Sequence, residues 1–170
     1  LTAADLGTAT TTGTIVFNIR NNITKPIRLV VDKDADIVID DCYQMFRRCS
    51  YLVSADLRGF NTSNVSTMAQ MFQDCSGITT LNLSSFDVSN VTDMSYMFGC
   101  AKLTTIYVAK GADWSGVATS DCMFQGCSRL KGGNGTAFNS SAIDATRARI
   151  DGLNGQPGYF TMVRMPGELY

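Results

Sequence analysis

Apolar and polar residues alternate along this chain in a pattern that repeats every 26 residues. Each unit opens with a Met-Phe pair, has a cysteine shortly afterwards and continues with a run of alternating apolar and polar residues. A fixed period of this length is typical of a solenoid, in which each coil packs against the next. We expect two ladders in the core, one of phenylalanines at Phe46, Phe72, Phe98 and Phe124 and one of cysteines at Cys49, Cys75, Cys100 and Cys127.

Two kinds of apolar spacing occur inside each unit. Towards the end of residues 78–83, apolar and polar side chains alternate, which predicts a short half-buried strand. In residues 89–100, apolar side chains recur at intervals of three and four, which predicts a short helix with one buried stripe. Asp87 or Ser89 could cap the start of that helix. We therefore expect each coil to contain one strand, a turn, one short helix and a return.

The two ends of the chain depart from the period. We assign residues 1–40 to an N-terminal β cap, residues 41–130 to the repeat array and residues 131–170 to a C-terminal cap, all within one structural domain. In the N-terminal cap, residues 37–39 are expected to pair with the first strand of the array. Aromatic and aliphatic side chains are expected to plug the last coil, namely Phe138, Ile150, Tyr159 and Phe160. The predicted fold class is an α/β solenoid of about four 26-residue strand-plus-short-helix coils with both ends capped.

The cysteines share one column of the repeat, so we interpret them as buried, reduced core residues. Neighbouring coils would lie about 4.8 Å apart, which is close enough for a disulfide. Parallel side chains in register do not favour the disulfide torsion, so a disulfide in the ladder is the lesser alternative. The chain has no histidine and no C-x-x-C motif, which argues against a zinc site and against a cysteine nucleophile.

Two further motifs have a structural and a functional interpretation. Asp32, Asp34 and Asp36 have the spacing of a calcium loop, but Ile37 and Tyr43 replace its glycine and closing glutamate, so we favour a solvated acidic turn. Asn64 and Asn90 lie in Asn-x-Ser/Thr sequences that recur with the period. They are either glycosylation acceptors or, as we favour, amides that bond to backbone groups between coils.

Composition narrows the possible functions. The 170 residues include 14 Lys and Arg and 15 Asp and Glu, so the net charge is close to zero. A net charge near zero does not indicate binding to nucleic acid or to an anionic membrane. No apolar run approaches the roughly 20 residues of a membrane helix. Without histidine there is no Ser-His-Asp triad, and no phosphate-binding glycine motif is present. We therefore expect no enzymatic activity, no metal and no cofactor.

The outward side chains of the predicted strands form the candidate binding face. They are polar and differ between units, whereas the inward columns stay the same. Such variation suits a binding face, and it equally suits exposure to solvent without selection. The face comprises Ser54, Asp56, Arg58, Thr80, Asn82, Ser84, Thr105 and Tyr107.

The repeat resembles that of a known family. Residues 71–100, MFQDCSGITTLNLSSFDVSNVTDMSYMFGC, are similar to the unit of BspA-like leucine-rich-repeat surface proteins of bacteria, M-F-x-x-C-x-x-L-x-x-L-x-L-S-x-F-D-T-S-N-V-T-x-M-S-x-M-F. Residues 130–161 resemble the segment that often closes those arrays. The resemblance covers residues 42–161, is weakest over residues 1–40 and is interrupted by a one-residue deletion before Cys100. It implies a leucine-rich-repeat solenoid that is exported and non-enzymatic, and some members are adhesins.

The expected function follows from this resemblance and from the strand face. We expect an adhesin-like binding module, extracellular on the cell surface or secreted, which recognises an unidentified host or bacterial surface protein or glycan. The alternative is a structural spacer or stalk segment with no ligand of its own. We expect no nucleic-acid partner and no membrane insertion by this fragment, which we interpret as a monomeric domain within a larger chain.

Overall fold

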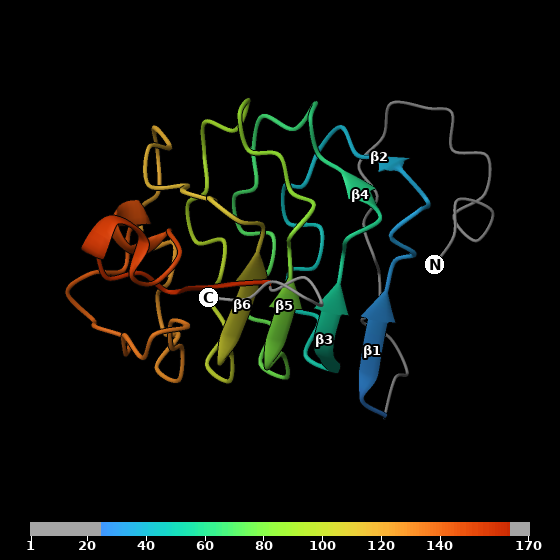
Figure 1. Ribbon diagram of the computed structural model, residues 1–170. Helices are drawn as coiled ribbons and strands as arrows, with labels where there is room; N and C mark the ends of the chain where they lie inside the picture. Colours follow the sequence, from blue (N-terminus) through green and yellow to red (C-terminus); the bar gives the residue numbers. More distant parts are fainter. Residues whose placement is uncertain (1–24, 164–170) are drawn as a thin grey trace.

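The computed structural model describes residues 25–163, which form a parallel β-solenoid. One long side of the solenoid is a five-stranded parallel sheet in the order β1-β3-β5-β6-β7 (Figure 1). Each of the first four strands lies one coil beyond its neighbour, and β7 follows the C-terminal cap. The strands are β1 (Ile27–Val30), β3 (Leu52–Asp56), β5 (Thr80–Asn82), β6 (Thr105–Val108) and β7 (Phe160–Met162).

The register of the sheet keeps equivalent residues of the repeat side by side. Leu29 pairs with Ala55, Ala55 with Leu81 and Leu81 with Ile106, and all four side chains are buried. The path from β1 to β6 therefore makes about three turns, where the sequence predicted about four. The fourth unit does not lead into a new strand. Instead, the N–H of Phe124 donates to the carbonyl of Ile143 in the C-terminal cap at 2.8 Å.

The N-terminal part of the array is arranged differently from the prediction. β1 lies within the segment assigned to the cap, yet it continues the main sheet as its first strand. A second, two-stranded sheet joins β2 (Ile37–Val38) to β4 (Phe60–Asn61). The prediction that residues 37–39 pair with the first strand of the array is therefore wrong, because their partner is the short strand that follows it. Residues 1–24 of the predicted β cap lie outside the described residues.

The predicted short helices are absent from the repeats. The described residues contain only two short 3₁₀ segments, η1 (Ala145–Arg147) and η2 (Leu153–Gly155), and both lie after the array. In place of a helix, alternate N–H groups donate to the next coil: Gln70 to the Ser95 carbonyl at 2.9 Å and Phe72 to the Met97 carbonyl at 2.9 Å. Because these N–H groups donate to the neighbouring coil, they cannot form the i→i−4 hydrogen bonds of an α-helix.

The intervening amides complete this arrangement with tight turns. The N–H of Met71 donates to the carbonyl of Met68, three residues earlier, at 3.2 Å. One residue in each turn has a left-handed backbone, with φ values of 55° to 58° at Gln44, Gln70, Tyr96 and Cys122. A left-handed residue interrupts a right-handed helix. Successive turns of three residues bury side chains at intervals of three and four, which is the spacing that suggested a helix.

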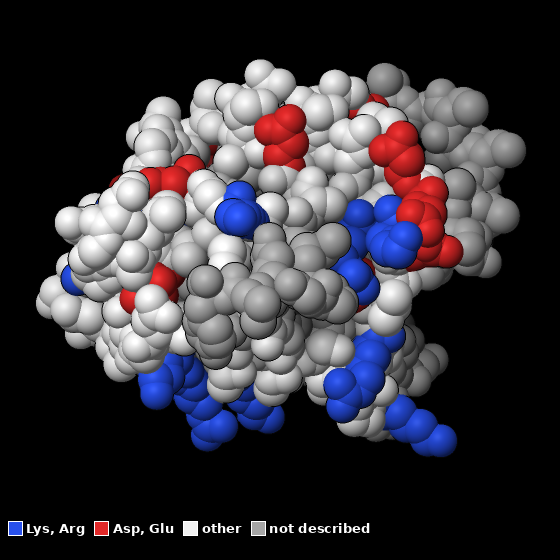
Figure 2. Space-filling model, in the orientation of Figure 1, with Lys and Arg blue, Asp and Glu red and all other residues white. Residues whose placement is uncertain are grey.

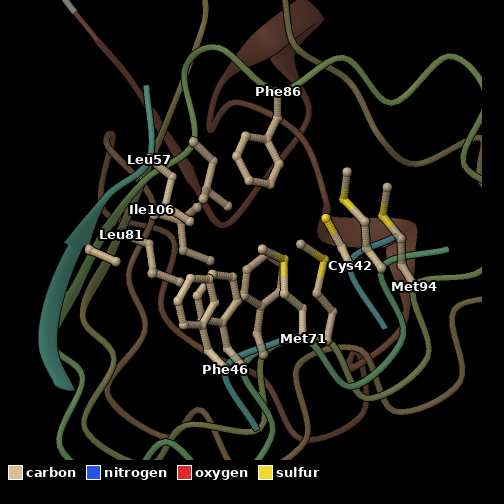
Figure 3. Close-up of a cluster of buried hydrophobic side chains, with 14 of the residues drawn as sticks. Cys42, Phe46, Leu57, Met71, Leu81, Phe86, Met94 and Ile106 are labelled. Carbon is tan, nitrogen blue, oxygen red and sulfur yellow. The ribbon is translucent and has the colours of Figure 1, made fainter. Parts of the chain in front are cut away.

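Stacked side chains fill the space enclosed by the coils. The rings of the phenylalanine ladder are nearly parallel, with centroids 5.3 Å apart for Phe46 and Phe72 and 6.1 Å apart for Phe72 and Phe98. Figure 3 shows Leu81 and Ile106 facing these rings from the sheet, with Cys42 and Met94 on the opposite side. The core is thus a set of parallel columns that run along the solenoid.

Aromatic residues close the C-terminal end. Tyr159 and Phe160 are fully buried, and their rings meet Phe124 edge-on at centroid distances of 5.1 and 6.2 Å. Phe138 and Ile150 are partly buried against the same core. The edge-on rings replace the parallel stacking that a further coil would continue, so they end the ladder. Within residues 25–163, the chain contains no helix with the length and apolar character needed to cross a membrane.

Truncation of one ring tests the phenylalanine ladder. Phe72→Ala should lower the free energy of unfolding by about 3–5 kcal/mol, because it leaves a cavity between two stacked rings. Urea denaturation followed by circular dichroism measures this loss. The exposed Ser76→Ala change should stay within about 0.5 kcal/mol of the wild type. A loss below about 1 kcal/mol for Phe72→Ala would contradict the burial of this ring.

Candidate functional site

The strand face contains two columns of outward side chains. Cα pairing joins Arg28, Ser54, Thr80 and Thr105 in the first column. It joins Val30, Asp56, Asn82, Tyr107 and Thr161 in the second column. Arg58 and Ser84 follow β3 and β5 at the carboxyl ends of the strands. The structure therefore brings all eight residues of the predicted face onto one surface, where they are half-buried or exposed.

Local hydrogen bonds fix two of these side chains. The Asp56 carboxylate accepts bonds from the Arg58 backbone N–H at 3.3 Å and from the Arg58 guanidinium Nη2 at 2.7 Å. The Asn82 Oδ1 accepts a bond from the Ser84 N–H at 3.2 Å. Both residues hold the turn that follows their strand. Their side chains are consequently presented in fixed positions, which lowers the entropy that a bound ligand would have to offset.

Tyr107 differs from these two residues. Its side chain is half-buried, and within the described residues no hydrogen bond holds its hydroxyl group. A tyrosine on a sheet surface combines apolar contact area with one hydrogen-bonding group. Tyr107 is therefore the residue of this face best suited to anchor a partner.

Three members of the two columns were not among the predicted residues. Arg28 and Val30 were overlooked because their segment was assigned to the cap, although they lie 26 residues before Ser54 and Asp56. The period itself was the signal that could have found them. Thr161 reaches the face through β7, 54 residues after Tyr107, and no repeat spacing indicates it.

The cysteine ladder contains buried thiols. The Cys75 Sγ donates to the Phe46 carbonyl at 2.9 Å, and the Cys100 Sγ donates to the Phe72 carbonyl at 3.0 Å. All six cysteines are free in the structure. Burial raises the pKa of Cys127 to about 12 and raises the pKa of Cys100 well above its ordinary value. Cys100 and Cys127 therefore stay protonated at neutral pH and pack as small apolar groups.

The acidic turn is held by separate local contacts. The Asp32 Oδ1 accepts a bond from the Asp34 N–H at 3.0 Å, and the Asp34 carboxylate pairs with the Lys33 Nζ at 2.7 Å. The Asp36 Oδ1 accepts a bond from the Asn61 side-chain amide at 3.0 Å. Nowhere in residues 25–163 do three or more Asp, Glu, Cys or His side chains lie close enough to hold a metal ion.

The two periodic asparagines bond between coils. The Asn90 Nδ2 donates to the Ser63 carbonyl at 2.7 Å, and the Asn64 Nδ2 lies 3.4 Å from the Asp40 Oδ1. In both pairs the acceptor belongs to the preceding coil. The side-chain amides thus take part in the stacking of the solenoid.

A buried carboxylate in the C-terminal cap, that of Asp151, accepts four hydrogen bonds from three residues. Only 5% of the Asp151 surface is exposed. Its Oδ2 accepts bonds from the N–H groups of Asn134 and Thr136, both at 2.9 Å. Its Oδ1 accepts the Thr136 hydroxyl at 2.6 Å and the Gly158 N–H at 3.2 Å. We call these contacts the Asp151 clasp. They tie the loop at residues 132–136 to the segment that leads into β7.

The Asp151 clasp has a structural role and leaves no room for a ligand. A Cβ atom on Gly132 would lie 2.6 Å from the Asp151 Oδ2, and one on Gly158 would lie 2.2 Å from the Arg149 carbonyl oxygen. Burial by itself raises the pKa of Asp151, but the hydrogen bonds from Thr136, Gly158 and Asn134 together lower it below the usual value. The sequence carried no signal for this residue, since a single Asp near a Gly-rich loop has no specific pattern.

Residues 19–151 match the model of a known protein family. The matching family is described as Mycoplasma protein of unknown function, DUF285. The chain belongs to the DUF285 family. The matched residues include the whole DUF285 repeat array, both columns of the strand face up to Tyr107, and Asp151. Neither the curated proteins nor the solved structures contain a match to this DUF285 chain.

Removal of the Asp151 charge tests the clasp. A carboxyl group whose pKa is lowered by folding stabilises the fold above its unfolded-state pKa of about 3.9, and this contribution disappears as the pH falls through the folded-state pKa. Asp151→Asn should lower the free energy of unfolding at pH 7 by about 2 kcal/mol, because an amide nitrogen would face backbone donors.

The difference between wild type and Asp151→Asn should shrink as the pH falls below about 4, as measured by urea denaturation across pH 2–7. Asp121→Asn, at an exposed position of the array, is the matched control and should change stability little. A constant difference across this pH range would show that the Asp151 charge does not contribute to stability.

Proposed function

We propose that the chain is a non-enzymatic, adhesin-like binding module that recognises a protein or glycan through its strand face. The observation that carries the proposal is the contrast between the two sides of the same strands. The inward column stays aliphatic at Leu29, Ala55, Leu81 and Ile106. The outward column changes from an aliphatic side chain to a carboxylate, an amide and a phenol, at Val30, Asp56, Asn82 and Tyr107.

The geometry of the face supports recognition of an extended partner. Neighbouring strands lie about 4.8 Å apart, so the outward side chains form closely spaced rows across the five strands of the sheet. Hydroxyl and amide groups suit hydrogen bonding to a polypeptide or to sugar hydroxyls, and Tyr107 supplies apolar area. Fixed side chains at Asp56 and Asn82 favour a specific partner over a promiscuous one.

We further propose that the coils are of the BspA-like leucine-rich-repeat type and that the protein acts outside a bacterial cell, on its surface or after secretion. Two features support the assignment to the BspA-like repeat type: the repeated Met-Phe and cysteine columns, and the presence of one strand per coil. The burial of Cys42 and of the four ladder thiols is compatible with a location outside the cell. Buried thiols are protected from thiol–disulfide exchange in an oxidising environment.

Binding of the purified domain to host matrix proteins and bacterial surface glycans, measured by surface plasmon resonance, tests the proposal. The structure suggests a variant that preserves net charge and keeps an acceptor oxygen in both turns: Asp56→Asn, Asn82→Asp and Tyr107→Thr combined. It should weaken binding at least about tenfold, while the free energy of unfolding stays within about 1 kcal/mol.

A control variant carries the same three substitutions away from the strand face: Asp121→Asn, Asn154→Asp and Tyr43→Thr. It should bind as the wild type does. Equal affinity of the strand-face variant for an identified ligand would refute the proposed site. Absence of binding across the panel, from protein shown to be folded, would favour the spacer function instead.

A further inference from the structure

Half of the Lys and Arg residues of this nearly neutral protein lie on one edge of the solenoid. Residues 25–28, 47–51, 73–79 and 99–104 lie at the starts of β1, β3, β5 and β6, and residues 125–131 are their equivalent in the last repeat. We call the surface that these five segments form the amino edge. These segments contain seven Lys or Arg residues and one acidic residue, Asp74. The basic residues are Lys25, Arg28, Arg47, Arg48, Lys102, Arg129 and Lys131.

Backbone hydrogen bonds place the segments of the amino edge side by side. The Ile27 N–H donates to the Tyr51 carbonyl at 2.8 Å, and the Thr79 N–H donates to the Val53 carbonyl at 2.8 Å. The Thr104 N–H donates to the Thr79 carbonyl at 2.9 Å, and the Lys131 N–H donates to the Thr104 carbonyl at 3.1 Å. The amino edge is therefore one continuous surface along the solenoid.

Figure 2 shows the result of this arrangement. Lys and Arg side chains gather along the lower border, where the strands of Figure 1 begin, and the Asp and Glu side chains visible in this view lie above it. Six of the seven basic side chains are exposed, and Arg47 is half-buried. Arg48 and Asp74 face each other at 3.6 Å, with most of both side chains in solvent. A local excess of cations creates a positive potential even where the net charge is near zero.

The edge is long and narrow. Lys25, Tyr51, Gly77, Lys102 and Arg129 precede the successive coils by sequence position, so at about 4.8 Å per coil this row spans roughly 20 Å. Exposed hydroxyl groups of Ser50, Ser76 and Ser128 lie in the same segments. We infer that the amino edge binds an acidic polysaccharide, whose sulfate or carboxylate groups pair with the basic side chains and whose sugar hydroxyls meet the serines and the ring of Tyr51.

Two other anionic partners fit the edge less well. The exposed large apolar residues of the described chain are Val30, Val38, Tyr43 and Tyr51, and of these only Tyr51 lies on the amino edge. A membrane surface would call for an apolar cluster to insert between headgroups. A single-stranded nucleic acid would call for a platform of several aromatic rings. A linear polysaccharide needs neither feature.

The test uses dextran sulfate as the probe, with neutral dextran of the same length as its control, at an ionic strength of about 0.15 M. The wild-type domain should bind dextran sulfate and not neutral dextran in isothermal titration calorimetry, and added salt should weaken the binding. The combined variant Lys102→Gln, Arg129→Gln and Lys131→Gln should bind about tenfold more weakly, since each exposed ion pair contributes a factor of a few.

A control variant removes three positive charges elsewhere: Lys33→Gln, Lys110→Gln and Arg147→Gln. It should keep wild-type affinity, as should the charge-neutral strand-face variant, which separates this inference from the proposed function. Thermal unfolding verifies that each variant is folded. The inference is overturned by absence of binding to dextran sulfate, by an equal loss in both triple-charge variants, or by tighter binding to duplex DNA or to phosphatidylserine vesicles.

Discussion

The structure depends on backbone hydrogen bonds that run from each coil to the next at the Met-Phe turns. The N–H of Phe46 donates to Met71, that of Phe72 to Met97 and that of Phe98 to Met123. These bonds lie opposite the sheet's own ladder, so every coil is held to its neighbours on two sides. The same arrangement fixes the phenylalanine rings in one stack and points Cys75, Cys100 and Cys127 at a carbonyl of the preceding coil. Side-chain columns and backbone ladders therefore impose a single spacing on the whole solenoid.

In a solenoid the stacked core must end at the last coil, and the repeat determines which side chains lie on the surface. At the C-terminal end, edge-on rings stop the phenylalanine stack, and the Asp151 clasp supplies acceptors for backbone groups that no further coil can pair. On the surface, each coil contributes one position per column, so neighbouring side chains of different chemistry lie in rows. The strand face and the amino edge are two such surfaces, and they differ in charge because they draw on different positions of the same repeat.

Much of the array follows from the sequence, because its columns repeat. Period and alternation predicted the strands around Leu81 and Ile106, and the solenoid was correctly inferred from them. The helix prediction for residues 89–100 was wrong, because a buried spacing of three and four fits successive turns as well as a helix, and only the path of the N–H groups separates the two. Asp151 and Thr161 escaped prediction, since the cap follows no period. The amino edge escaped it too, because overall charge says nothing about how charges are distributed.

Through-hydrogen-bond scalar coupling in the NMR spectrum of isotope-labelled protein tests the central claim most directly, because it identifies the acceptor of each amide. The structure predicts coupling between the Phe72 N–H and the carbonyl carbon of Met97, and between the Gln70 N–H and that of Ser95. Coupling of the Phe72 N–H to Met68, four residues earlier, would instead establish a helix in the repeat and contradict the ladder on which this account of the fold and its surfaces depends.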